Sequence, residues 1–332
     1  MNRRCFLLMS VAAPLAPLKA QAQTTERVSR VGVLSPNPAP LIDRLIAALG
    51  ERGWVMGRNL VVDLRYTHGD PQRAEGLARE LVAQRVNVIV TNFTATAMAA
   101  HRATSVTPIV MATSGFPVEG GLANSLARPG GNVTGMTVYA GGGPLFGKFV
   151  QLLRELLPSL RDLCVFWGYA PPSYKLEQVA PAIEELHRAT NVLNINLRFW
   201  QTGSENDLAS ALDAASNVPL DALFVTGGVI HGRPEIAPKI ARFILQRRLP
   251  TVTDGAGPFF VAGAVSAYTA EPTELAARTA HFIDRILKGA KPGELPIEQP
   301  TKYELVVNRK MAKSIGLTIP PSLLLRADQV IE

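Results

Sequence analysis

Short apolar runs rich in β-branched residues alternate along this chain with longer stretches in which apolar residues recur at helical spacing. In the first half, this pattern predicts five strands separated by helices. The predicted strands are 31–34, 60–66, 88–91, 109–112 and 133–138, and the predicted helices are 41–52, 72–84, 94–104 and 118–127. Strands that alternate with helices are typical of a parallel sheet covered on both faces.

The same alternation begins again in the second half. The predicted strands there are 163–167, 195–200, 222–225, 251–253 and 263–267, and the predicted helices are 145–157, 174–190, 206–216 and 235–248. A helix at 273–288, a strand at 303–307 and a last helix at 309–316 follow. Two such series predict an α/β protein made of two Rossmann-like lobes with parallel sheets.

The segment 139–144, which holds three glycines and a proline, separates the two series. Because such a stretch favours neither helix nor strand, we expect the chain to cross between the lobes there. Two tandem lobes would need no C-terminal tail, so we expect the chain to recross near 268–271 and again near 296–300. The expected lobes are 28–139 plus 268–296 and 144–267 plus 297–332. A three-crossing hinge limits the lobes to opening and closing about one axis.

The first 22 residues have the features of an export signal. Arg3 and Arg4 precede an apolar run, and the run ends at Ala20-Gln21-Ala22, a small-x-small cleavage site. The run is too short to span a bilayer, which takes about 20 residues. We therefore expect a soluble mature protein in the periplasm. The paired arginines also resemble a twin-arginine signal, and both export routes stay open.

Cysteine content and net charge limit the possible disulfides and the possible partners. Cys5 leaves with the signal, so Cys164 remains as a predicted buried strand residue and no internal disulfide can form. The formal charge of +7 falls to +4, because Arg3, Arg4 and Lys19 are removed with no acid. The basic residues are scattered, which argues against a nucleic-acid partner.

The sequence contains none of the common enzyme motifs, neither a glycine-rich nucleotide loop nor a G-x-S-x-G, H-E-x-x-H or C-x-x-C pattern. Its five histidines lie far apart and lack the helical partners of known metal sites. We therefore expect no catalysis, no cofactor and no metal.

Polar and aromatic residues gather where the predicted strands end. In open α/β sheets, ligands bind beyond the carboxyl ends of the strands. The candidate ligand-binding residues are Ser35, Asn37, Asn92, Phe93, Thr94, Thr113, Ser114, Tyr169, Thr226 and Asp254. Hydroxyls and backbone N–H groups suit a carboxylate, Asp254 an ammonium and Phe93 an apolar group, so a small polar ligand such as an amino acid is predicted. Alternatively, such residues are helix N-caps, above all Thr113 and Thr226.

Three stretches resemble the ABC transporter substrate-binding protein family that includes the tryptophan-binding TrpX type. They are LARPGGNVTG at 126–135, ILKGAKP at 286–292, and EQPTKYELVVN at 298–308 running on to GLTIP at 316–320. The likeness extends from about residue 29 to the end of the chain. Where the family commonly has Asp-Pro-Val after the fourth strand, this chain has Phe116-Pro117-Val118.

The resemblance implies a type I periplasmic-binding fold with three hinge crossings and no catalysis. It also implies a monomer that delivers a small-molecule ligand to ABC permease and ATPase subunits. A periplasmic module that senses a ligand for a signalling receptor is the alternative, and the sequence alone does not separate the two.

Overall fold

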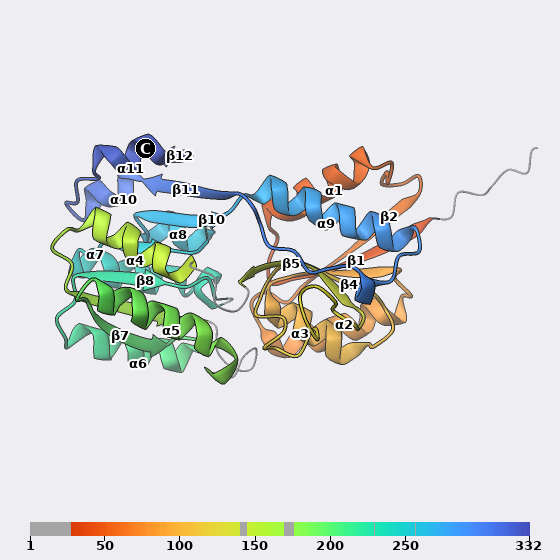
Figure 1. The fold of residues 1–332 in the computed structure, drawn as a ribbon, viewed down its shortest axis with the longest axis horizontal. Coiled ribbons are helices and arrows are strands. Elements are labelled where there is room, and N and C mark those ends of the chain that lie inside the picture. Colours follow the sequence, from red (N-terminus) through yellow and green to blue (C-terminus); the bar gives the residue numbers. More distant parts are fainter. Residues whose placement is uncertain (1–27, 140–144, 169–175, 229, 256) are drawn as a thin grey trace, which may run out of the picture.

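The computed structural model describes residues 28–332, apart from 140–144, 169–175, 229 and 256. It consists of two lobes that lie side by side and are joined by narrow segments (Figure 1). The first lobe holds a five-stranded parallel sheet in the order β2-β1-β3-β4-β5. Its strands are β1 Ser29–Ser35, β2 Leu60–Tyr66, β3 Val88–Asn92, β4 Ile109–Gly115 and β5 Val133–Tyr139. All five strands predicted for the first half are confirmed.

Two pairs of helices enclose this sheet. The pair α1 (Pro40–Glu51) and α9 (Pro272–Leu287) packs together over one apolar cluster, and the pair α2 (Pro71–Ala83) and α3 (Thr94–Ala103) packs over another. Alternate residues of the strands feed the two clusters, as Val33 and Leu34 of β1 do. The strands are therefore apolar on both sides, as the continuous apolar runs predicted.

The predicted helix at 118–127 is wrong, because these residues form turns and bends. Gly121 has a φ of +73°, which a helix cannot contain, and the carbonyl of Pro117 accepts hydrogen bonds from the N–H groups of Leu122 and Ala123. The apolar side chain of Leu122 still packs into the first lobe, which explains the helix-like spacing of apolar residues.

The second lobe holds a seven-stranded sheet in the order β12-β11-β10-β9-β8-β6-β7. Its strands are β6 Asp162–Trp167, β7 Asn196–Gln201, β8 Ala222–Val225, β9 Thr251–Thr253, β10 Ser266–Ala270, β11 Tyr303–Asn308 and β12 Gln329–Ile331. Strands β6 to β10 are mutually parallel, whereas β11 pairs antiparallel with β10 and β12 pairs parallel with β11, so these last two strands run the opposite way. The chain leaves this lobe at the end of β10 and returns beside that end, so β11 must run the opposite way.

One large apolar cluster fills the second lobe. Its helices are α4 Leu145–Leu156, α5 Leu176–Val192, α6 Glu205–Ser216, α7 Ala237–Arg247, α8 Pro258–Gly263, α10 Arg309–Ser314 and α11 Pro321–Arg326. The short elements α8, α11 and β12 were not predicted. The strand predicted at 263–267 begins late because α8 occupies residue 263.

Sheet pairing places the second and third crossings. Tyr268 pairs with Leu305, and Ala270 pairs with Tyr303, so residues 268–270 belong to the second sheet. Glu298 bridges to Met136 of β5, so residues 297–298 lie on the first lobe. Both boundaries therefore lie a few residues later than the expected limits of the lobes. The first crossing was expected at 139–144, of which residues 140–144 lie outside the described part of the chain.

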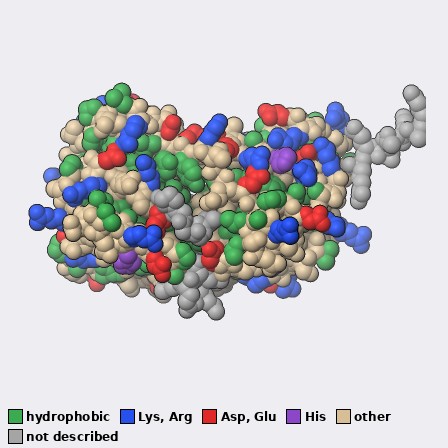
Figure 2. Space-filling model, viewed as in Figure 1, with side chains coloured by type: hydrophobic (Ala, Val, Ile, Leu, Met, Phe, Trp, Pro, Cys, Tyr) green, Lys and Arg blue, Asp and Glu red, His purple; other side chains and the backbone are tan. Residues whose placement is uncertain are grey.

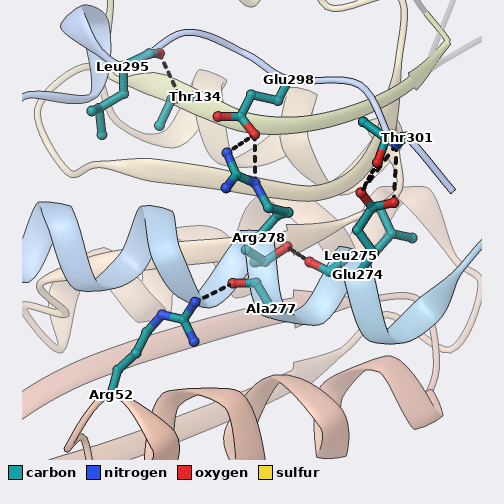
Figure 3. A network of polar contacts seen from close by, with 10 residues as sticks. Arg52, Thr134, Glu274, Leu275, Ala277, Arg278, Leu295, Glu298 and Thr301 are labelled. Atoms are coloured by element: carbon teal, nitrogen blue, oxygen red, sulfur yellow. Dashed lines mark hydrogen bonds and ion pairs between the residues drawn. The ribbon is translucent and has the colours of Figure 1, made fainter.

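Helix α9 holds the third crossing in place, as Figure 3 shows. The guanidinium of Arg278 donates to the carboxylate of Glu298, with Nε at 2.7 Å. The Glu274 carboxylate accepts from the backbone N–H groups of Thr301 and Lys302 at 3.1 and 2.9 Å. The returning chain is thus fastened to the first lobe until Lys302, the residue before β11.

Candidate functional site

The strand ends of the two lobes meet at Tyr139 and Asp254. The hydroxyl of Tyr139, the last residue of β5, donates to the Asp254 carboxylate at 2.5 Å. Asp254 follows β9 in the other lobe and also accepts a hydrogen bond from the backbone N–H of Gly227, just after β8. This predicted residue therefore links both lobes, and its carboxylate accepts one hydrogen bond from each of them.

Three predicted residues of the first lobe form one polar cluster. The Asn92 side chain donates to Ser35 Oγ at 3.3 Å and accepts from the Thr113 hydroxyl at 2.6 Å. These residues come from the ends of β1, β3 and β4, which are neighbours in the sheet. Ser35 also donates to the backbone carbonyl of the partly exposed Asn37 at 2.8 Å. The strand-end rule thus selected residues that lie 57 and 21 positions apart in sequence and that contact one another in the structure.

Phe93 holds a strained backbone conformation at the start of α3. Its φ is +73°, its side chain makes no cap on α3, and the residue is 37% exposed. A positive φ is rare for a bulky residue and costs of order 1–3 kcal/mol, and such residues cluster at binding sites. The backbone N–H of Phe93 donates to the Thr113 carbonyl at 2.8 Å, which holds the residue in this position.

The remaining predicted residues differ in their surroundings. The hydroxyl of Thr94 accepts from the Gly115 N–H at 2.8 Å, and that of Thr226 accepts from the Gly168 N–H at 2.8 Å, so both fix neighbouring strand ends. The Ser114 side chain is buried, and its Oγ has no hydrogen-bond partner among the described residues. Tyr169 lies outside the described part of the chain.

Sequence reasoning missed the aromatic residues around Tyr139. The Tyr139 ring stacks on Phe116 at 5.7 Å between centroids and on Phe146 of α4 at 4.9 Å. Phe116 is buried with a φ of +51°. Tyr139 ends a predicted strand, so the same strand-end rule could have identified it.

His231 was also missed, and it fixes the loop that carries Gly227. Its Nδ1 lies 2.6 Å from the Thr226 carbonyl, which only accepts, so Nδ1 carries the proton and Nε2 accepts from the Thr202 hydroxyl at 2.9 Å. Burial lowers the pKa of His231 to about 4, so the ring is neutral at pH 7. A methyl group on Gly228 would lie 2.7 Å from the Gly168 Cα, so this loop packs tightly against the end of β6.

Among the described residues, possible metal ligands are dispersed and the cysteine is inaccessible. The described residues include no cluster of three histidines, cysteines or acids that could hold a metal. Cys164 is fully buried, and burial raises the pKa of its thiol, which disfavours the reactive thiolate. Figure 2 shows acidic and basic side chains interspersed over the visible face of both lobes. No helix in the described ranges has the length and apolar character needed to cross a membrane.

A depression of about 420 Å³ lies at the opposite end of the first sheet. Its lining includes Ser29, Asn87 and Pro108, which lie at or just before the amino ends of β1, β3 and β4. The end of α9, at Ile286 and Leu287, and the following residues Gly289, Ala290, Lys291 and Pro292 complete it. The polar cluster around Asn92 is at the other end of these same strands, so this depression is separate from the candidate site.

Comparison with known proteins agrees with this architecture. A family model described as ABC transporter substrate binding protein matches residues 38–331. A tyrosine-binding protein of Clostridioides difficile (strain R20291) is 22% identical over 298 residues, which cover 88% of this chain and 82% of that protein.

Two solved structures share the fold over 92% of this chain and the whole of theirs. A conserved domain protein of Vibrio cholerae has a TM-score of 0.80 at 25% identity. An ABC domain in complex with L-Trp from Streptococcus pneumoniae has a TM-score of 0.79 at 24% identity. The two-lobed α/β structure is therefore the type I periplasmic-binding fold that the sequence resemblance implied. The match to the family model covers most of the chain, and the chain belongs to the ABC transporter substrate-binding protein family.

Proposed function

We propose that this protein binds an amino acid with an aromatic side chain between its lobes and delivers it to an ABC importer. The observation that carries the proposal is the meeting of strand ends from both lobes at Tyr139 and Asp254. A ligand held there contacts both lobes at once, so binding favours the closed arrangement over the open one.

The side chains provide one group for each part of an amino acid. The Asp254 carboxylate suits the ammonium, and the Asn92 amide, which Ser35 and Thr113 orient, suits the carboxylate. Phe93 offers an exposed aromatic face for the apolar side chain. The tyrosine named for one relative and the L-Trp bound to another support an aromatic ligand. Asn37, Ser114 and Tyr169 stay in the proposed site, whereas Thr94 and Thr226 support it through the backbone.

Family membership and the sequence of residues 1–22 support export and delivery as parts of this proposal. Residues 1–22 direct the chain to the periplasm, and the mature protein begins near Gln23. It works as a monomer with permease and ATPase subunits and catalyses no reaction. Intact-mass measurement of protein from the periplasmic fraction tests the export step. A periplasmic form that keeps residues 1–22 would contradict it.

A thermal-shift screen of the purified mature protein tests the ligand class. L-Tryptophan, L-tyrosine and L-phenylalanine should raise the melting temperature, because a ligand that binds only the folded state stabilises it. Tryptamine, which lacks the carboxylate, and indole-3-propionate, which lacks the ammonium, should raise it far less. Stabilisation by sugars or nucleosides instead of amino acids would disprove the proposed ligand.

Small-angle scattering tests the clamp. Saturating L-tryptophan should reduce the radius of gyration, because the lobes close about the three crossings. An identical scattering curve with and without a ligand that binds would mean that binding occurs without closure.

A further inference from the structure

A second contact joins the lobes through Arg233 and Gly69. Arg233 follows the short helix η1 (Ile230–Gly232) in the second lobe, and Gly69 lies between β2 and α2 in the first. The Arg233 Nε donates to the Gly69 carbonyl at 3.0 Å, and its Nη2 donates to the same oxygen. One guanidinium edge thus binds one carbonyl across the boundary between the lobes.

Arg233 and the loop that holds Gly69 are each fixed by hydrogen bonds within their own lobe. The Arg233 Nη1 lies 3.4 Å from Glu205 Oε1, a carboxylate of the second lobe, and the Arg233 side chain is 20% exposed. In the first lobe, the Thr67 N–H donates to the Ser35 carbonyl at 3.0 Å, and Asp70 caps α2. The carbonyl of Gly69 is therefore presented by a loop fixed at both ends.

Gly69 is the residue that this contact requires. Its φ is +75°, which disfavours every side chain, and it is buried beneath Arg233. A Cβ on Gly69 would lie 2.8 Å from the Arg233 Nε and 2.9 Å from its Cγ. The close approach of the two residues therefore depends on the missing side chain.

Rotation about the hinge would break this contact and leave the bonds inside each lobe intact. We propose that Arg233 is the latch of the closed state, a positioning residue that holds the lobes together and slows ligand release. The effect on release rests on the proposed function, whereas the latch itself acts without ligand. Charged hydrogen bonds of this kind contribute modestly, so loss of the latch should speed release about tenfold, or about 1.4 kcal/mol.

Distances between the lobes test the latch directly. Spin labels on Arg73→Cys in the first lobe and Asn206→Cys in the second, in a Cys164→Ser background, report the separation by pulsed electron paramagnetic resonance. Without ligand, the parent should show an open and a closed population, and Arg233→Ala and Gly69→Ala should each lose the closed one. The double variant should lose no more. Arg242→Ala, which removes an exposed arginine of α7, is the matched control and should change nothing.

Release of L-tryptophan by stopped flow completes the test. Arg233→Ala should raise the dissociation rate about tenfold with a nearly unchanged association rate. Unchanged distances in Arg233→Ala would overturn the latch, even if Gly69→Ala folds poorly. Loss of L-tryptophan binding with unchanged distances would also overturn it, because Arg233 would then be a direct ligand contact. If the parent protein binds no amino acid, the proposed function fails and the distances still decide the latch.

Discussion

The hydroxyl of Tyr139 donates to the carboxylate of Asp254 at 2.5 Å, although the two residues lie 115 positions apart and in different lobes. Tyr139 is buried between two other aromatic rings, so its hydroxyl has little freedom to move. Asp254 is consequently oriented from both sides, by this hydroxyl and by the Gly227 N–H. A carboxylate held in this way is prepared to receive a cationic group without reorganisation.

Asp254→Asn should weaken L-tryptophan binding at least tenfold, because truncating one partner of a desolvated charge pair costs about 2–5 kcal/mol. Isothermal titration calorimetry measures the change. Binding of indole-3-propionate, which has no ammonium, should change much less. Asp213→Asn on the exposed face of α6 is the matched control. Equal losses for both compounds would mean that Asp254 shapes the site and does not bind the ammonium.

Tyr139→Phe separates the hydrogen bond from the aromatic stack. The variant keeps a ring against Phe116 and Phe146 and loses only the hydroxyl, so its melting temperature should change little. Affinity for L-tryptophan should fall about fivefold, in line with the modest net value of one hydrogen bond, about 1 kcal/mol. A large loss of melting temperature with unchanged affinity would assign the hydroxyl to folding.

Phe93→Gly and Phe93→Ala form a pair that separates backbone strain from ligand contact. Glycine accepts a φ of +73° without cost, so Phe93→Gly should be more stable than Phe93→Ala by about 1 kcal/mol. Both variants should lose at least tenfold in L-tryptophan affinity, because both remove the aromatic face. Urea unfolding and calorimetry measure the two effects. Wild-type affinity in both variants would place the apolar part of the ligand elsewhere.

Cys164→Ser should fold and bind L-tryptophan normally, at a cost of about 1 kcal/mol for placing a hydroxyl in an apolar strand. The thiol is buried and its pKa is raised by burial, so a thiol reagent should modify it only after unfolding. Rapid modification of the folded protein by a chromogenic disulfide, followed by its absorbance, would contradict this assignment.

His231 should make the stability of the protein depend on pH. Burial lowers its pKa to about 4 in the folded state, whereas an unfolded histidine titrates near 6.5. Between these values the unfolded chain binds a proton that the folded chain does not, so the free energy of unfolding falls as the pH falls from about 6.5 toward 4. The free energy of unfolding that His231 contributes above pH 6.5 and loses below pH 4 approaches about 3 kcal/mol.

Urea unfolding of the parent protein and of His231→Gln at several pH values measures this effect. Carboxylates contribute equally to both proteins, so the difference between them isolates His231. The difference should be constant above pH 7 and should shrink or change sign on acidification. Parallel curves down to pH 4.5 would mean that His231 is not neutral and buried as described.

The sequence by itself determined the repeated α/β order, the five strands of the first lobe and most helices, because each depends on the local period of apolar residues. It also determined that polar residues such as Asn92 and Asp254 would follow strands, since chain order alone fixes what comes after an apolar run. The resemblance at 298–320 predicted the family, and the family model that matches residues 38–331 confirmed it.

Only the tertiary structure decided which of these strand ends act together. The pairs Tyr139–Asp254 and Arg233–Gly69 join residues 115 and 164 positions apart, and no local pattern encodes such a distance. The antiparallel pairing of β10 with β11 and the late positions of the crossings have the same origin, because the chain must return at the point where it left. Thr94 and Thr226 were polar residues at strand ends like the others, and only their hydrogen bonds showed that backbone groups already occupy their hydroxyls.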